Sequence, residues 1–128
     1  EIRRIEAVGI ENAIEMFDMK VGHVGINADG PEQAAAWAGD FFKLLGLPVN
    51  DGDKSVWSGN LVEIMKGNGR GRLGHIAIKV NDCDKALEYF KGRGMTPAEE
   101  TRKVENGKTV FIYFEEEIAG FAIHLNQA

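Results

Sequence analysis

The chain has 128 residues, a mass of 14.1 kDa and a formal net charge of −5 at pH 7. This length suits one ordinary domain, and a composition of 44% hydrophobic and 27% charged residues is typical of a folded globular protein. The acidic balance argues against binding to nucleic acid or to an anionic membrane surface. No apolar run approaches the roughly 20 residues that a membrane helix needs, and the charged N-terminal residues do not resemble a secretory signal.

Two further features bound the location and organisation of the protein. Cys83 is the only cysteine, which excludes an internal disulfide and a cysteine-based zinc cluster, so we expect a reducing compartment, the cytoplasm. Residues 1–17 carry a loose helical stripe of apolar side chains with charges opposite. We therefore expect an N-terminal helix or a linker from an upstream domain over residues 1–19, and the main domain over residues 20–128.

The main domain contains one pattern twice, at an offset of 52 residues. Residues 22–28 read Gly-His-Val-Gly-Ile-Asn-Ala, and residues 74–80 read Gly-His-Ile-Ala-Ile-Lys-Val. Both segments alternate and are rich in β-branched residues, which predicts two strands. Self-similarity at a fixed spacing indicates an internal structural duplication.

An amphipathic helix is predicted after each of these strands, over Glu32–Leu45 and over Cys83–Lys91, with Gly46 and Gly94 as left-handed caps. Short strands and turns then complete each copy. They are the turn 50–53 with strands 55–57 and 60–66 in the first copy, and strands 101–104, 109–115 and 121–127 in the second. The sequence thus predicts two modules, 20–67 and 73–127, each made of a strand, a helix and about three strands.

Strand parity separates the polar residues from the core, because successive side chains of a strand point to opposite faces. The apolar rows must face the two helices. The opposite, helix-free face then receives all three histidines of the chain and one carboxylate: His23, Glu63, His75 and His124. Singly, such residues are more often satisfied strand histidines or surface-paired carboxylates. Three imidazoles and one carboxylate on one face instead favour a catalytic divalent metal site with a position open for substrate.

Six other residues are candidates for contacts to a small-molecule substrate. Four have the parity of the helix-free face and would form an apolar wall with one hydroxyl: Trp57, Met65, Phe111 and Tyr113. The alternative is that they fill a sheet interface or a dimer contact. Arg70 and Arg72 lie in the inter-module linker, where they are either solvated or bind a substrate carboxylate or phosphate.

The repeat and its four polar residues resemble the vicinal oxygen chelate superfamily, which includes glyoxalase I, fosfomycin-resistance enzymes and extradiol dioxygenases. The resemblance covers about residues 20–127. It implies an α+β fold in which two βαβββ modules form an open, cup-shaped mixed sheet, with helices on the outer face, around one divalent metal ion (Zn, Ni, Mn, Co or Fe). The implied ligands come from the first and last strands of the modules: His23, Glu63, His75 and His124.

The sequence departs from the family at one position. His124, in Gly-Phe-Ala-Ile-His-Leu, stands where the family often has glutamate, so Glu63 is the only carboxylate at a family position for general base work. The resemblance implies a glyoxalase-like lyase or isomerase, acting as a homodimer on a small hydroxycarbonyl or a thiol adduct. The alternative is a non-catalytic domain that binds a small molecule.

Other members of the superfamily fit less well. An extradiol dioxygenase needs a further acid–base group near the metal, and the three histidines are already assigned as ligands. No feature selects thiol transfer to fosfomycin. The stretch leading into Lys20-Val21-Gly22-His23 also resembles the junction in fused bacterial 2-keto-3-deoxy-6-phosphogluconate aldolases, which implies an aldolase-associated domain. The linker 66–73 leaves open whether modules of one chain or of two chains pair.

Overall fold

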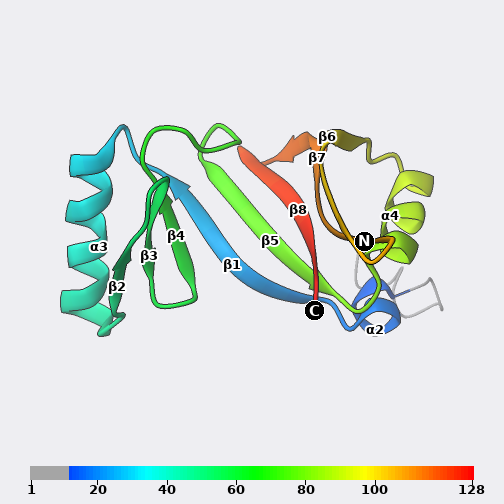
Figure 1. Cartoon of the computed structure of the whole chain (residues 1–128), viewed down its shortest axis with the longest axis horizontal. Helices are drawn as coiled ribbons and strands as arrows, with labels where there is room; N and C mark the ends of the chain where they lie inside the picture. Colours follow the sequence, from blue (N-terminus) through cyan, green and yellow to red (C-terminus); the bar gives the residue numbers. More distant parts are fainter. Residues whose placement is uncertain (1–11) are drawn as a thin grey trace.

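In the computed structural model, which describes residues 12–128, the described chain forms three helices and one mixed sheet of eight strands (Figure 1). The strand order is β2-β3-β4-β1-β5-β8-β7-β6. The elements in chain order are α2 (Ala13–Phe17), β1 (Lys20–Asn27), α3 (Pro31–Leu45), β2 (Val49–Asp51), β3 (Ser55–Ser58), β4 (Val62–Met65), β5 (Gly74–Val80), α4 (Cys83–Gly92), β6 (Pro97–Glu105), β7 (Lys108–Ile118) and β8 (Phe121–Gln127).

The two modules of the one chain join through their first strands. β1 pairs antiparallel with β5, while β4 runs parallel to β1 and β8 runs parallel to β5. Figure 1 shows β1 and β5 crossing the middle of the molecule, with α3 and α4 at its opposite ends. This arrangement confirms the predicted α+β fold of two βαβββ modules in an open mixed sheet.

Local signals set the ends of the helices. α3 begins at Pro31, whose missing N–H costs nothing in the first turn, and ends at Gly46 with φ of 72°. α4 begins after Asp82, whose side chain accepts a hydrogen bond from the Lys85 N–H at 3.1 Å. Gly94 follows the end of α4 with φ of 107°, as expected of a left-handed position.

The second module differs from the sequence expectation in its strand lengths. β6 begins at Pro97, four residues earlier than predicted, and β7 continues to Ile118 rather than ending at Glu115. Backbone pairing of β6 with β7 and of β7 with β8 extends these strands beyond their apolar stretches. Among residues 12–128, no helix is both long enough and apolar enough to cross a membrane.

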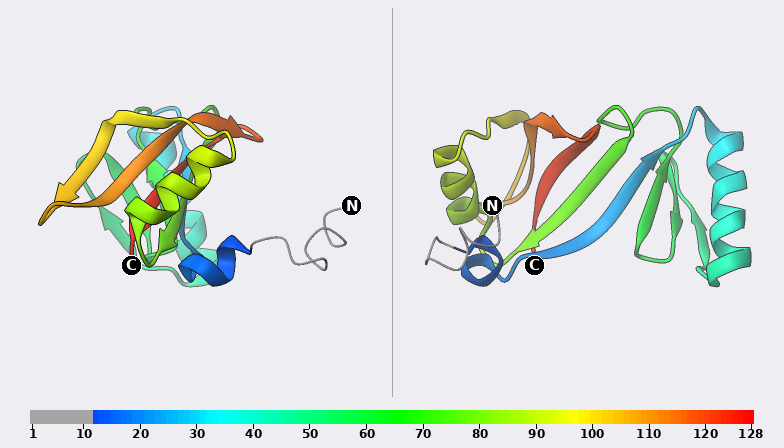
Figure 2. Two further views of the ribbon diagram at one scale, coloured as in Figure 1. Left: turned by 90° about the vertical axis from the view of Figure 1, so that its right-hand side faces the viewer. Right: turned by 180° about the vertical axis from the view of Figure 1, so that it is seen from behind.

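The short helix α2 packs on the second module (Figure 2). Phe17 is only 5% exposed, and its ring lies 5.5 Å from that of Tyr89 and 6.2 Å from that of Phe90. The Asn12 side chain caps this helix by accepting from the Ile14 N–H at 3.0 Å. Residues 1–11 of the predicted N-terminal stripe lie outside the described residues, and an upstream origin of residues 1–19 stays a prediction.

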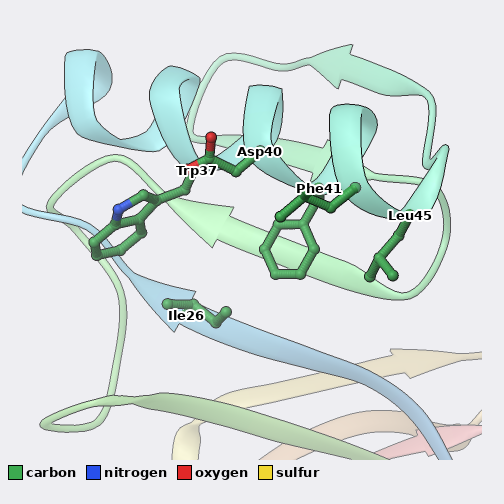
Figure 3. Close-up of a pocket in the computed structure, with 6 residues that line it drawn as sticks. Ile26, Trp37, Asp40, Phe41 and Leu45 are labelled. Atoms are coloured by element: carbon green, nitrogen blue, oxygen red, sulfur yellow. The ribbon is translucent and has the colours of Figure 1, made fainter.

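The first module has an open space where its helix faces β1. A cavity of about 520 Å³ lies between them, with Trp37, Phe41 and Leu45 of α3 on one side and Ile26 of β1 on the other (Figure 3). We call this space the α3–β1 groove. α3 packs instead on β3 and β4, where Ala34, Ala38, Val56 and Ile64 belong to a buried cluster.

Candidate metal centre

The three histidines come from three neighbouring strands at the middle of the sheet. His23 lies on β1, His75 on β5 and His124 on β8, and one ligand nitrogen of each lies within 4.8 Å of the others. The pairing registers bring them together, because His23 and His124 both lie opposite Ala77 of the central strand. His75 and His124 are each only 2% exposed, so two of the three imidazoles are buried.

Glu63 of β4 lies beside two of these histidines, His75 and His23. Its Oε1 lies 3.2 Å from Nε2 of His75 and 3.6 Å from Nε2 of His23, and the two Nε2 atoms lie 3.1 Å apart. The other carboxylate oxygen, Oε2, accepts a hydrogen bond from the Ser55 hydroxyl at 2.7 Å. Ser55 therefore holds the carboxylate with one oxygen directed at the histidines.

These spacings fit a divalent metal ion. Ligand atoms about 2.1 Å from a metal lie about 3.0 Å apart at right angles and about 3.4 Å apart in a tetrahedron. The three distances among His23, His75 and Glu63 fall around these values. Imidazole nitrogens with one carboxylate oxygen suit zinc, nickel, iron or manganese. Nδ1 of His75 and of His124 are buried and have no hydrogen-bond partner among residues 12–128.

The local electrostatics favour, for His23 and His124, the neutral form that metal binding needs. Burial lowers the pKa of His124 to about 3, and the nearby His75 and His23 add to this effect. Burial also lowers the pKa of His23, helped by His75 and by the positive charge of Lys79. Burial raises the pKa of Glu63, but hydrogen bonds from His75 and Ser55 outweigh it and leave that pKa below its usual value.

Aromatic side chains line the cluster. The Trp57 ring lies 4.8 Å from that of His23, while the rings of Phe111 and Tyr113 lie 4.5 and 4.8 Å from that of His124. Burial raises the pKa of Tyr113 to about 12, so its phenol keeps its proton at neutral pH. The Arg70 guanidinium lies over the Tyr113 ring at 5.1 Å, within cation–π range.

Met65 and Arg72 are the other two candidates for substrate contacts. Met65 is the cross-strand partner of Asn27 at the end of β1. The Arg72 guanidinium lies beside Gly120 of the turn between β7 and β8, and its backbone N–H donates to Glu117 at 3.1 Å. The structure therefore brings Trp57, Phe111, Tyr113 and Arg70 to the cluster or its wall, whereas Arg72 packs against a turn. The binding roles of all six stay predictions.

Sequence reasoning missed two residues near the cluster. Ser55 has the same strand parity as Trp57, and this parity alone could have flagged it as a partner for Glu63. Lys79 has the parity of His75 and borders the same pocket as His23 and Trp57. The Lys79 side chain reaches this pocket because of a bulge at Gly22, which the alternation of apolar and polar residues in the sequence does not reveal.

Comparison with known proteins bears on the fold. No protein-family model and no curated protein matches the chain. One similar solved structure is the hypothetical protein BH1468 from Bacillus halodurans C-125, at 14% identity and a TM-score of 0.57, covering 86% of this chain and 94% of that one. Another is methylmalonyl-CoA epimerase, at 17% identity and a TM-score of 0.54, covering 84% and 93%. At these identities the likeness establishes the cup-shaped fold of the vicinal oxygen chelate type, and nothing finer.

Proposed function

We propose that this chain is a divalent-metal-dependent lyase or isomerase of the glyoxalase type, which moves a proton at a carbon next to a carbonyl of a small hydroxycarbonyl or thiol adduct. The supporting observation is that one nitrogen each of His23, His75 and His124 lies within 4.8 Å of the others on the helix-free face, with Oε1 of Glu63 3.2 Å from His75 and 3.6 Å from His23. A bound divalent metal would supply Lewis acidity, which acidifies a C–H bond next to a carbonyl.

The residues of the chain have separable roles in this proposal. Glu63 is the carboxylate beside His75 and His23, so it is the group that takes the proton, and the Ser55 hydroxyl fixes its orientation at 2.7 Å. Trp57 and Phe111 keep bulk water from the reacting carbon. The Tyr113 phenol, protonated at neutral pH, donates a hydrogen bond to a substrate oxygen.

The solved epimerase of similar fold supports this class of reaction, because methylmalonyl-CoA carries a C–H bond next to a thioester carbonyl. The alternative is a non-catalytic domain that binds a small ligand, for example within an aldolase polypeptide. The feature that favours this alternative is His124, which leaves the cluster with a single carboxylate. A binding domain would tolerate the loss of that carboxylate, whereas an enzyme would not.

Elemental analysis of protein purified without a histidine tag, compared with the His75→Ala variant, tests whether the chain binds a metal. We expect near-stoichiometric metal in the parent chain after soaking with nickel, zinc or manganese, and its loss in the variant. Metal in neither protein would contradict the proposal. The reaction is tested by deuterium exchange from solvent into a methylglyoxal–thiol adduct. Exchange that disappears in Glu63→Gln supports the enzyme, and metal binding without any exchange supports the binding domain.

A further inference from the structure

A second group of polar side chains lies next to the histidine cluster. A pocket of about 370 Å³ is bordered by His23 and Trp57, which also contact each other, and by three polar residues: Asn50, Asn60 and Lys79. Asn50 is the cross-strand partner of Trp57, so the two side chains point to the same side of the sheet. A ligand held at the cluster would therefore extend into a pocket with two amides and one ammonium group.

Lys79 reaches this pocket from the other module. It lies on β5, while Asn50 and Asn60 lie beyond β1 in the first module. Gly22 is the additional residue of a bulge in β1, and a Cβ at this position would lie 3.1 Å from Cγ and 3.3 Å from Cε of Lys79. The aliphatic part of Lys79 thus rests on the bare backbone of β1, which directs its ammonium group across that strand.

The charge arrangement is unfavourable for the fold itself. Lys79 lies directly opposite Lys20 across β1 and β5, and like charges in that relationship destabilise a sheet. Lys20 has a carboxylate nearby, since its Nζ lies 3.5 Å from Oδ2 of Asp18. Lys79 makes no ion pair with any residue from Asn12 to Ala128. The unpaired ammonium group of Lys79, in a pocket beside the histidine cluster, is suited to an anionic ligand.

We propose that Lys79, with the amides of Asn50 and Asn60, binds a carboxylate or phosphate group at the far end of a ligand whose chelating oxygens lie at the histidine cluster. The placing of the chelating oxygens at the cluster rests on the proposed metal-dependent function. The Lys79 ammonium is a compact charge on a flexible stem and accommodates either anion, while the asparagine amides donate the additional hydrogen bonds. Gly22 is a positioning residue, because it gives Lys79 room to cross β1.

Paired ligands test the proposal on zinc-loaded protein by calorimetry. Lactate and malate chelate alike but differ by a carboxylate, and glycerate and 3-phosphoglycerate differ by a phosphate. We expect the parent chain to bind one of the more anionic partners about tenfold more tightly, and Lys79→Met to lose that preference. The pair that shows the preference identifies the anion. The exposed Lys43→Met removes the same charge from α3 and should retain the preference. No preference in the parent chain, or a preference that survives in Lys79→Met, would overturn the proposal.

A metal-free measurement separates this proposal from the metal-dependent function. Inorganic phosphate should shift the amide resonances of Gly22, Asn50 and Asn60 in the parent chain, and these shifts should vanish in Lys79→Met. If zinc does not bind, these shifts decide the matter alone, and their absence or their persistence in the variant rejects the anion site. Gly22→Ala should weaken phosphate binding several-fold, because its Cβ presses on the Lys79 stem. Removing a like-charge pair should leave the thermal stability of Lys79→Met at or above that of the parent chain.

Discussion

Gly25 and His75 lie directly opposite each other across β1 and β5, and the His75 imidazole occupies the space that a Cβ at position 25 would fill. A glycine inside a strand normally weakens it, because it packs no side chain and gains flexibility when unfolded. Here the missing side chain lets a buried histidine turn its Nε2 towards His23 and Glu63. The geometry of the cluster therefore depends on a residue that is not itself a ligand.

Gly25→Ala should displace the His75 ring and reduce metal affinity by at least about tenfold, since one ligand loses its alignment. Metal titration of the purified variant measures this. The matched control is Gly39→Ala, because Gly39 lies within α3 and a Cβ there meets nothing within 4 Å. That change should leave metal affinity intact and slightly raise stability, as alanine is the better helix former. Unchanged metal binding in Gly25→Ala would show that His75 is not a ligand.

Ser55→Ala should impair proton transfer without removing the metal. The loss of the hydrogen bond to Oε2 of Glu63 raises the pKa of this carboxyl group, so the acid limb of the pH–rate profile should move to higher pH. We expect the acid limb to move by about one pH unit, with little change in activity at neutral pH. Ser58→Ala on the same strand removes a buried hydroxyl that has no hydrogen-bond partner among residues 12–128, and it should be neutral. An unshifted profile in Ser55→Ala would remove Glu63 from the role of base.

The stability of the metal-free protein should depend on pH through His124. Its pKa is about 3 in the folded chain and ordinarily 6.5, so between these values the unfolded chain binds a proton that the folded chain does not. The free energy of unfolding should therefore fall as the pH drops below about 6.5, by up to about 1.4 kcal/mol per pH unit from this group alone. The lowered pKa of His23 acts in the same direction.

His124→Phe tests this dependence, because a phenyl ring can pack against Phe111 and Tyr113 without titrating. Urea unfolding at several pH values should show a shallower loss of stability in acid for the variant than for the parent chain. The variant should also fail to bind metal. The two measurements together would show that His124 lowers the stability of the fold in acid and is needed for metal binding. Parallel pH dependences for the two proteins would place the acid sensitivity elsewhere.

Phe17→Ala should destabilise the domain by about 3 kcal/mol, because it removes a buried aromatic side chain from contacts with Tyr89 and Phe90. Phe42→Ala is the control, since Phe42 is 59% exposed and its loss should change stability by less than about 0.5 kcal/mol. Equal effects of the two changes would mean that α2 does not contribute to the core of the second module.

The sequence was sufficient for the architecture and for most of the cluster. The repeated segments around His23 and His75 predicted two modules, and strand parity placed Glu63 and His124 on the same face as these histidines. Parity works here because a helix covers one face of β4 and of β8, the strands that carry Glu63 and His124, so a shift by one residue would bury the polar row.

The remaining features depend on contacts that no local pattern encodes. Lys79 has the right parity, yet its reach over β1 follows from the bulge at Gly22, which is a property of how two strands pair. Arg72 lies close in sequence to Arg70, but the linker turns it towards Gly120, while Arg70 reaches Tyr113. The packing of Phe17 on α4 is also a tertiary contact. The apolar stripe of the N-terminal residues shows which side of the helix is buried, but not which element it packs on.

The two modules share a sequence pattern, but the helix of the second module is better covered by its neighbours than the helix of the first. In the second module Phe17 packs beside α4, whereas the α3–β1 groove leaves the matching side of α3 uncovered, with Leu44 and Leu45 exposed. A helix anchored on one side only opens at a lower free energy than one enclosed on both. Backbone amides of α3 should therefore exchange with solvent deuterium sooner than those of α4. Local opening of the fold would then begin in the module that supplies His23 and Glu63. Glu63 would be the first member of the cluster to lose its place, because α3 packs on β4, whereas β1 is also held by β5.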